Sequence, residues 1–368
     1  MLLIKANRDA LLKPLQSVTG IVERRQTMPI LANVLIEMRD DSMHFVATDN
    51  EIQITAKARS DGEAQSARIT TGARKLQDIL RSLPDQASVR IELQDGRLHV
   101  KSGHGRFNLQ TLPAEDFPKL SEMGEISGRV ETSQRQLKRL LSLVQYAMAQ
   151  QDIRYYLNGM LLVLDGNELK VVATDGHRLA YASCGIGSEN GRMDIILPRK
   201  TVMELSRLLS DTEDPVRIDL LQNQARFVFG DIDLITKVID GKFPDYNRVI
   251  PSGYSRNIAL ERTPLLQALQ RAAILTNDKV RGVRLVLSEN RLNIICSNTE
   301  HEEAQEEIEI SYSGGDLDIG FNISYLLDVL TNIDAQGVVF SFADSSSSLL
   351  VSIPDRDDFK YVVMPMRI

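Results

Sequence analysis

The chain has 368 residues, of which 43% are hydrophobic and 25% charged, and its formal net charge is −7. This length exceeds what one hydrophobic core normally supports, so two or three domains are expected. The negative charge argues against a protein that binds nucleic acid by bulk electrostatic attraction alone. No stretch approaches the roughly 20 apolar residues of a membrane span, and no secretion signal is seen, so we expect a cytosolic protein without a membrane partner.

The two cysteines, Cys184 and Cys296, have no partners at metal-ligand spacing. Four of the histidines, His44, His99, His104 and His301, are scattered along the chain. We therefore expect reduced thiols, no metal site and no cofactor.

Three segments of the chain begin alike, at residues 4–11 (IKANRDAL), 130–137 (VETSQRQL) and 258–265 (IALERTPL). A second motif recurs at nearly the same spacing, as residues 46–49 (VATD), 172–175 (VATD) and, less clearly, 295–298 (ICSN). Phe117-Pro118 and Phe243-Pro244 recur at the same spacing. A period of about 126 residues is the size of a whole domain. We predict three similar domains, covering residues 1–125, 126–253 and 254–368.

Each repeat opens with a short strand, a polar N-cap and an amphipathic helix, and the predicted caps are Asn7, Ser133 and Thr263. Pro14 predicts a kink or a late start in the first helix. A second helix is predicted in each repeat, at residues 74–83, 199–209 and 324–333.

Alternating runs with turn pairs such as Asp95-Gly96 and Asp165-Gly166 predict hairpins between the helices. The fold class is therefore α+β. Each domain should have two helices packed on two antiparallel sheets of about four strands.

Five of the six predicted helices carry a net positive charge, although the whole chain is negative. Solvated Lys and Arg side chains are the simple explanation for any one helix. If the helices share a surface, that surface attracts phosphate without reading sequence. The chain has no Trp, no zinc-finger spacing and no RNP-like motif, so base readout is poorly supported.

Residues 174–178 (TDGHR) place a hydroxyl, a carboxylate and an imidazole close together in the chain. A catalytic interpretation needs these groups in a specific spatial arrangement, which adjacency does not supply. The first repeat has Thr48 and Asp49 without a histidine, so a strand end with a turn is the simpler interpretation. We predict no catalytic residue and no enzyme.

Four stretches resemble the bacterial DNA sliding clamps, the beta subunits of DNA polymerase III: residues 11–16 (LLKPLQ), 151–160 (QDIRYYLNGM), 173–180 (ATDGHRLA) and 361–367 (YVVMPMR). The resemblance runs from end to end. It implies a ring-forming homodimer that encircles double-stranded DNA without sequence specificity and serves as a processivity factor. The helices would line the central hole, and the sheets would form the outer wall.

The resemblance also implies site residues. DNA would be contacted by Arg25, Gln151, Tyr155, Tyr156, Arg199 and Lys200. The subunit contact would pair Phe107 with Ile274 and Leu275. A pocket for partner peptides would be formed by Leu157, Thr174, Gly176, His177, Arg178, Leu179, Pro244, Arg248, Val249, Asn322, Tyr325, Ser345, Ser348, Val362, Met364, Pro365, Met366 and Arg367.

The partners implied are the DNA polymerase III alpha subunit, the clamp loader complex, translesion polymerases, mismatch-repair proteins and ligase. The implied location is the bacterial cytoplasm, associated with the nucleoid during replication. Ser346 stands where a relative has an apolar residue at the pocket edge, which leaves the peptide preference open. The alternative is a three-domain hydrolase or ligand-binding protein with its site at residues 174–178.

Overall fold

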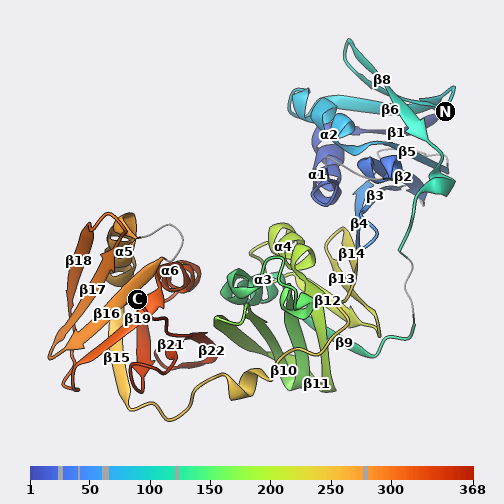
Figure 1. Ribbon diagram of the computed structural model, residues 1–368. Coiled ribbons are helices and arrows are strands. Elements are labelled where there is room, and N and C mark those ends of the chain that lie inside the picture. The colour runs from blue at the N-terminus through green and yellow to red at the C-terminus, as the bar shows by residue number, and fades with distance from the viewer. Residues whose placement is uncertain (24–27, 40–41, 60–65, 121–123, 277–280) are drawn as a thin grey trace. The chain divides into compact units, whose positions relative to one another are not determined.

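The computed structural model describes residues 1–23, 28–39, 42–59, 66–120, 124–276 and 281–368 (Figure 1). The chain forms two compact units. Unit 1 comprises Met1–Leu137 and Met203–Val238, and unit 2 comprises Lys138–Val202 and Ile239–Ile368. None of the helices within the described ranges combines the length and apolar composition that a membrane crossing requires.

A twelve-stranded antiparallel sheet forms the frame of unit 1, in the order β1-β6-β7-β8-β5-β2-β3-β4-β14-β13-β12-β9. Alternate residues of its strands are buried, as Val89 and Ile91 in β6 illustrate. Asp95 and Gly96 have φ values of 52° and 70°, which confirms the predicted tight turn between β6 and β7. The strands are β1 (Leu2–Asn7), β2 (Asn33–Arg39), β3 (Ser42–Thr48), β4 (Ile52–Arg59), β5 (Ala67–Gly72), β6 (Ser88–Gln94), β7 (Arg97–Ser102), β8 (Gly105–Leu112), β9 (Gly128–Ser133), β12 (Pro215–Leu220), β13 (Gln224–Phe229) and β14 (Ile232–Lys237).

Helices α1 (Arg8–Thr19) and α2 (Ala73–Ser82) pack against each other, and α1 also packs against β3 and β4. The predicted cap Asn7 is confirmed, because its side chain accepts a hydrogen bond from the amide of Asp9 at 2.9 Å. The predicted late start is wrong, because α1 begins at Arg8 and contains Pro14. Burial of Leu11 and Leu15 on either side of the proline offsets its cost of about 3 kcal/mol.

Two antiparallel sheets form unit 2, one of six strands in the order β10-β11-β22-β21-β20-β15 and one of four in the order β18-β17-β16-β19. Helices α5 (Arg262–Ala272) and α6 (Ile323–Asn332) lie side by side (Figure 1). The strands are β10 (Gly159–Thr174), β11 (Arg178–Pro198), β15 (Arg256–Glu261), β16 (Gly282–Ser288), β17 (Arg291–Ser297), β18 (Glu303–Glu309), β19 (Leu317–Asn322), β20 (Gly337–Phe342), β21 (Leu349–Ile353) and β22 (Arg356–Val363).

Two helices differ in how their N-termini are capped. Ser133 accepts from the amide of Gln136 at 3.2 Å and so caps α3 (Gln134–Val144), as predicted. Thr263 is not a cap, because α5 begins at Arg262 and Glu261 is its N-cap. Pro264 in the first turn of α5 has no amide to satisfy and a φ already suited to a helix, so this start depends less on a side-chain cap.

The remaining helices are short, apart from α4 (Arg199–Leu208). The 3₁₀ helices are η1 (Pro29–Ala32), η2 (Ala114–Asp116), η3 (Gln145–Ala147), η4 (Tyr155–Leu157), η5 (Tyr246–Arg248) and η6 (Ala273–Leu275).

The predicted triple repeat is visible in the strand pairing. In every repeat the strand before the first helix pairs with the strand after the second: β1 with β6, β9 with β12, and β15 with β20. Within the residues that the structure describes, the first and third repeats each have two α-helices and eight strands, as predicted. In the second repeat β10 and β11 are long continuous strands. Their pairing shifts register on both sides of Gly166, whose φ is 60°, where a turn was predicted.

Two strand pairs join successive repeats. In unit 1, β4 pairs with β14 and Ile52 lies opposite Thr236; we call this the first junction. In unit 2, β11 pairs with β22 and Arg178 lies opposite Val363; we call this the second junction.

Candidate functional site

The turn at residues 174–178 lies between β10 and β11 at the second junction. The Thr174 hydroxyl donates to the carbonyl of Arg178 at 2.6 Å and accepts from the amide of Gly176 at 3.1 Å. The Asp175 carboxylate accepts from the amides of His177 and Arg178 at 2.9 and 3.0 Å. Gly176 has a φ of 89°, in the left-handed region that favours glycine. These side chains therefore stabilise their own backbone, as the turn interpretation predicted.

The first junction has the same turn. The Thr48 hydroxyl donates to the carbonyl of Ile52 at 2.9 Å, and Asp49 accepts from the amides of Glu51 and Ile52 at 2.9 and 2.8 Å. Asn50 occupies the left-handed position with a φ of 74°. Since a turn without histidine repeats these bonds, they do not indicate catalysis. Among the residues that the structure describes, no group of three or more His, Cys, Asp or Glu side chains is placed to hold a metal ion.

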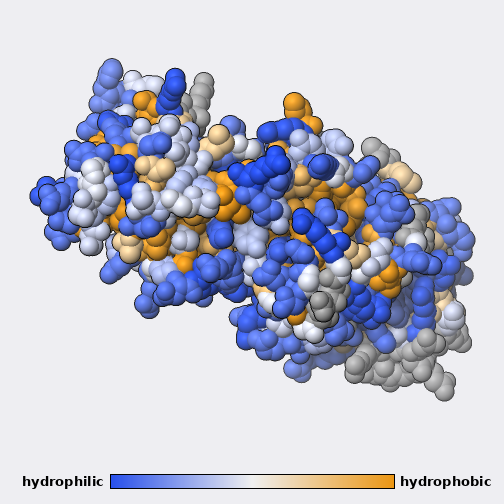
Figure 2. Space-filling view, turned by 90° about the horizontal axis from the view of Figure 1, so that it is seen from below, coloured by the Kyte–Doolittle hydropathy of each residue, from blue (hydrophilic) through white to orange (hydrophobic). Residues whose placement is uncertain are grey.

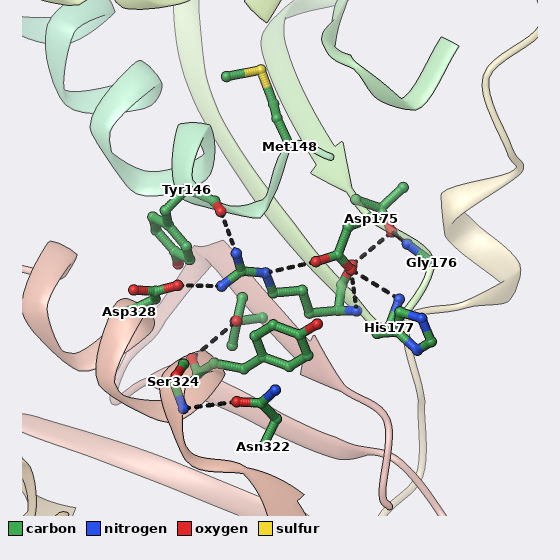
Figure 3. A network of polar contacts seen from close by, with 12 residues as sticks. Tyr146, Met148, Asp175, Gly176, His177, Asn322, Ser324 and Asp328 are labelled. Carbon is green, nitrogen blue, oxygen red and sulfur yellow. Dashed lines mark hydrogen bonds and ion pairs between the residues drawn. The ribbon is translucent and has the colours of Figure 1, made fainter. Parts of the chain in front are cut away.

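Arg178 makes the two turns different, because its counterpart at the first junction is Ile52. The Arg178 guanidinium bonds to Tyr146, Asp175 and Asp328, which Figure 3 labels, and its side chain is only 10% exposed. It donates to the Asp328 carboxylate of α6 at 2.5 Å, to Asp175 at 3.1 Å and to the main-chain carbonyl of Tyr146 at 2.5 Å. One side chain of the second repeat is thereby bonded to α6 of the third.

Three tyrosines surround this guanidinium. Its central carbon lies 4.4 Å from the centroid of the Tyr325 ring and 5.7 Å from that of Tyr146. The Tyr361 hydroxyl donates to the carbonyl of Tyr325 at 3.0 Å. Burial raises the pKa of Tyr361 and of Tyr325, so both hydroxyls stay protonated. Burial alone would lower the pKa of Arg178, but the Tyr361 hydroxyl and the Asp328 carboxylate outweigh it and raise that pKa.

The C-terminal residues 364–368 lie against this site. The amide of Met364 donates to the carbonyl of His177 at 2.9 Å, and the amide of Met366 donates to the carbonyl of Gly320 in β19 at 2.8 Å. A Cβ atom at Gly320 would lie 2.5 Å from the carbonyl oxygen of Met366, and one at Gly282 would lie 2.9 Å from the side chain of Ile368. The two glycines therefore leave the space that this segment occupies.

An apolar cluster lies under the turn. It comprises Leu161, Val163, Val172, Leu179, Ile196, Phe243, Tyr246 and Val362. Leu179 and Val362 are opposite one another in the β11–β22 pair. The segment that follows Phe243 continues into η5. Asp245 is the N-cap of η5, and its side chain accepts from the amide of Asn247 at 3.3 Å. This arrangement leaves Pro244 and Val249 exposed above the buried cluster.

All the residues predicted for the peptide pocket lie in unit 2. The buried ones are Leu157, Thr174, Leu179 and Val362. The half-buried ones are Arg178, Asn322, Tyr325, Ser348, Pro365 and Met366. The exposed ones are Gly176, His177, Pro244, Arg248, Val249, Ser345, Met364 and Arg367. We call the peptide-binding surface that these residues are predicted to form the groove.

Direct contacts join several members of the groove. His177 bonds to Met364 through the main chain, Arg178 stacks on Tyr325, and Leu179 faces Val362. Ser345 and Ser348 lie in a turn where Asp344 accepts from the amide of Ser346 at 2.8 Å, as expected for a polar turn rather than a linker. Tyr254 donates to the carbonyl of Ser348 at 2.9 Å. Hydrophobic residues also reach the surface on the face drawn in Figure 2, and Met364 is 50% exposed.

Three of the predicted DNA-contacting residues, Gln151, Tyr155 and Tyr156, lie on one loop of unit 2 at residues 149–158, and the Arg199 amide donates to the carbonyl of Asn158 at 3.1 Å. Asn158 closes this loop through two hydrogen bonds of 2.9 Å with the main chain of Asp152. Gln151 and Tyr155 are exposed on it, and the rings of Tyr155 and Tyr156 meet edge to face at 5.9 Å. The Arg199 guanidinium donates to the carbonyl of Met148 at 3.2 Å. Lys200 follows in the first turn of α4. Arg25 lies outside the described residues.

The charges on the helices support the predicted phosphate-attracting surface only in part. Five of the six α-helices keep a net positive charge within their observed bounds. Some of their arginines are engaged in ion pairs with acidic residues elsewhere in the chain: Arg8 with Asp85, Arg135 with Asp211 and Arg271 with Glu306. The positive charge available to a ligand is therefore smaller than a count along the sequence indicates.

The predicted subunit-contact residues lie beside two strand edges. Phe107 is on β8, which pairs with β7 along its length but with β5 only through Leu112 and Thr111. Ile274, 77% exposed, and Leu275 are on η6, which packs against β17 and β18. In the described part of the chain β18 is the last strand of its sheet.

Sequence reasoning missed several residues of this site. Asp328 and Tyr146 contact Arg178, but they lie 150 and 32 residues from it in the chain. Arg154 lies beside Gly176, and it lowers the pKa of Asp152 to about 2 through a hydrogen bond between the two side chains. Of these contacts, only the one between Asp152 and Arg154 could have been predicted from the local sequence, because the two residues are two positions apart.

Comparisons with known proteins match the whole chain. Family models of the DNA polymerase III beta subunit match its N-terminal domain at residues 2–121, its central domain at 131–245 and its C-terminal domain at 247–367. The beta sliding clamp of Pseudomonas aeruginosa is 48% identical over 363 residues, and that of Escherichia coli K12 is 43% identical over 363 residues; both alignments cover 98% of each chain. The crystal structure of a sliding clamp from Pseudomonas aeruginosa bound to griselimycin has a TM-score of 0.97 at 46% identity and full coverage of both chains.

Proposed function

The chain belongs to the bacterial DNA sliding clamps, the beta subunits of DNA polymerase III, and we propose that it closes into a homodimeric ring whose grooves tether partner proteins to duplex DNA. Sliding clamps are processivity factors of DNA replication and do not catalyse a reaction. The alternative of a hydrolase with its site at residues 174–178 has no support from these relatives. We retain the domain limits 1–125, 126–253 and 254–368 as part of this proposal.

The ring proposal rests on the edges of strands β8 and β18. Within the chain, β4 of the first repeat pairs with β14 of the second, and β11 of the second pairs with β22 of the third. By position in the repeat, β18 is the counterpart of β4, and β8 is the counterpart of β14 and β22. Pairing β18 with β8 of a second copy therefore repeats the same junction twice and closes a two-fold ring. Phe107 on β8 would then meet Ile274 and Leu275 beside β18.

The proposed DNA contacts follow from charge and position. Arg25, Gln151, Tyr155, Tyr156, Arg199 and Lys200 would touch the duplex backbone without reading its sequence. Because a closed ring is held on DNA by topology, these contacts need only be weak. This accounts for a protein that acts on DNA with a net charge of −7.

The groove suits short peptides that bear Leu or Phe. Its base is the apolar cluster, and Met364 and Met366 give it side chains that adapt to different ligands. The bound griselimycin of the Pseudomonas aeruginosa clamp supports ligand binding by a close relative. The proposed partners are the polymerase III alpha subunit, the clamp loader, translesion polymerases, mismatch-repair proteins and ligase. Ser346 at the groove edge would make the peptide preference differ from that of relatives with an apolar residue there.

No cofactor is part of this function. The proposed place of action is the bacterial cytoplasm, at the nucleoid during replication, because the DNA is there.

Retention on circular DNA tests the proposal. The protein is loaded onto nicked circular DNA with clamp loader and ATP, washed with high salt, and the circle is then cut. Retention through the wash followed by release on cutting is expected, because topology and not charge holds a ring. A known clamp loaded in parallel shows that the loader is active. Release by salt from circular and linear DNA alike would contradict the ring.

A variant of the same assay tests the subunit contact. Ile274→Asp should abolish salt-resistant retention and halve the mass in solution, since a charge would be buried at the proposed contact. Ile126→Asp is the matched control, because Ile126 is also exposed, at 41%, but lies on neither strand edge. Loss of retention in both variants would argue against this contact.

A further inference from the structure

Asp328 lies on α6 one helical turn after Tyr325, so both side chains lie on the same face. Its carboxylate accepts from Arg178 at 2.5 Å, and its side chain is 42% exposed whereas that of Arg178 is 10% exposed. Asp328 is not one of the groove residues. Figure 3 shows it on the far side of the guanidinium from Asp175, so the two carboxylates hold the guanidinium from opposite sides.

The sheet junction does not require this contact. The first junction has the same strand pairing, but Ile52 is buried where the second junction has Arg178. The counterpart of Asp328 is Glu204, the sixth residue of α4, which pairs with Arg207 of its own helix at 2.7 Å. This pair lies against Gly20, and Arg207 also donates to the carbonyl of Ser17 at 2.8 Å, but at the position of Arg178 the turn itself contributes only the uncharged Ile52. The pairing of the two strands therefore does not depend on an arginine in the turn.

The contact fixes the orientation of a side chain that forms the groove wall. Asp175, Asp328 and the carbonyl of Tyr146 together bind Nε, Nη1 and Nη2 of Arg178, so the planar guanidinium is held in one orientation. In that orientation it lies over the Tyr325 ring at 4.4 Å. Without Asp328, Nη1 loses its acceptor, and the guanidinium and the ring are free to adopt other arrangements.

We propose that Asp328 is a positioning residue for the groove: it holds Arg178 against Tyr325 and so keeps the groove in its binding shape before a peptide arrives. The inference rests on the proposed function of the groove. When only a fraction of the free protein has the competent shape, the apparent Kd rises by the inverse of that fraction. A loss of Asp328 that leaves about one molecule in five competent would weaken binding about fivefold.

The test is a fluorescence-polarisation titration with a labelled peptide that contains Leu and Phe. Asp328→Asn keeps the size of the side chain but removes its charge, and should weaken binding about fivefold, since an ion pair of this exposure corresponds to a change of that order. Asp358→Asn is the matched control. It breaks the ion pair between Arg139 and Asp358, 2.8 Å long, which joins the same two repeats without touching Arg178. It should leave the affinity within about 1.5-fold of wild type, a change of at most about 0.25 kcal/mol.

Two further variants separate positioning from general loosening. Asp328→Glu keeps a carboxylate within reach of Arg178 and should recover most of the affinity, which also keeps the test informative if the Asn variant folds poorly. In an Arg178→Met background, Asp328→Asn should have no further effect, because residues that act through one another are not additive.

The outcomes are distinct. A wild-type protein that fails to bind the peptide contradicts the proposed function of the groove. Wild-type binding with an unchanged Asp328→Asn variant overturns the positioning role alone. Equal weakening by Asp328→Asn and Asp358→Asn also overturns it, because the cause is then a looser junction.

Discussion

The segments that follow Phe117 and Phe243 have equivalent places in the first and second repeats, and both phenylalanines are buried in apolar clusters, but the polar bonds of the two segments differ. In unit 1 the Lys119 ammonium donates to the buried Glu37 carboxylate at 2.6 Å, and the Leu120 amide donates to the Gln53 side chain at 2.9 Å. The segment is thus bonded through polar groups to the sheet beneath it.

In unit 2 the counterparts of Glu37 and Gln53 are Val163 and Leu179, and both belong to the apolar cluster with Phe243 and Tyr246. Here the segment is held by burial of apolar surface. The apolar side chains that stay exposed near this segment include those of Val249, 45% exposed, and Met364, 50% exposed, and this is where we propose that the groove lies. The first junction has an equivalent apolar cluster that includes Leu35, Val46 and Phe117, but there Glu37 and Gln53 add polar bonds to the segment.

The comparison supports the proposal that a repeated fold carries a binding site at one junction and not at the other when two or three positions change from polar to apolar or the reverse. The turn and the pairing of the two strands are common to both junctions. We propose that the groove depends on Leu179, Val163 and Arg178.

Leu179→Gln should have the largest effect, because it gives the second junction the residue of the first. A buried amide in an apolar cluster without partners costs about 2 kcal/mol of unfolding free energy, and peptide binding should fall more than tenfold. Urea unfolding and the polarisation titration measure the two quantities. The reverse change, Gln53→Leu, removes the bond to Leu120 and should cost about 1 kcal/mol while leaving peptide binding unchanged. If Gln53→Leu weakened the peptide equally, the two junctions would not be independent.

Gly320→Ala should weaken peptide binding about tenfold through the C-terminal segment. The new Cβ would lie 2.5 Å from the carbonyl oxygen of Met366, a main-chain atom, so the segment must shift and displace Met364 and Met366 from the groove. Gly185→Ala is the control, because no atom lies within 4 Å of a Cβ there. An unchanged affinity for Gly320→Ala would show that the segment is not part of the groove.

Glu37→Gln should affect stability at the first junction and leave the groove unchanged. Burial alone would raise the pKa of Glu37, but Lys119, Arg39 and Arg68 together lower it. A carboxyl whose pKa is lowered on folding contributes stability above its unfolded pKa and loses it as pH falls through the folded value. Wild type should therefore exceed Glu37→Gln by about 1 to 2 kcal/mol at pH 7, and the difference should shrink below about pH 4.

Urea unfolding at pH 7 and at acidic pH measures this difference, and the peptide titration at pH 7 serves as the control. A gap between the two proteins that persists unchanged under acid conditions would mean that the charge of Glu37 is not what stabilises this site.

Local patterns in the sequence predicted much of this protein. The apolar spacing predicted the second helix of each repeat to within about one residue, the recurring Thr-Asp pairs predicted the turns, and the recurring openings predicted three repeats. Each of these depends on residues close together in the chain, where spacing alone decides which side chains share a face. The family resemblance rested on the same local strings.

Contacts between residues that are distant in the chain could be seen only in the tertiary structure. It brings Asp328 to Arg178 across 150 residues, lays residues 364–368 over Gly320, and binds Lys119 to Glu37 across 82 residues. It also engages helix arginines such as Arg8 and Arg135 in ion pairs, so their charge is not free for a ligand. These contacts join residues far apart in the chain. The effect of Gln at position 53 or Leu at position 179 likewise depends on which distant segment the fold brings next to it.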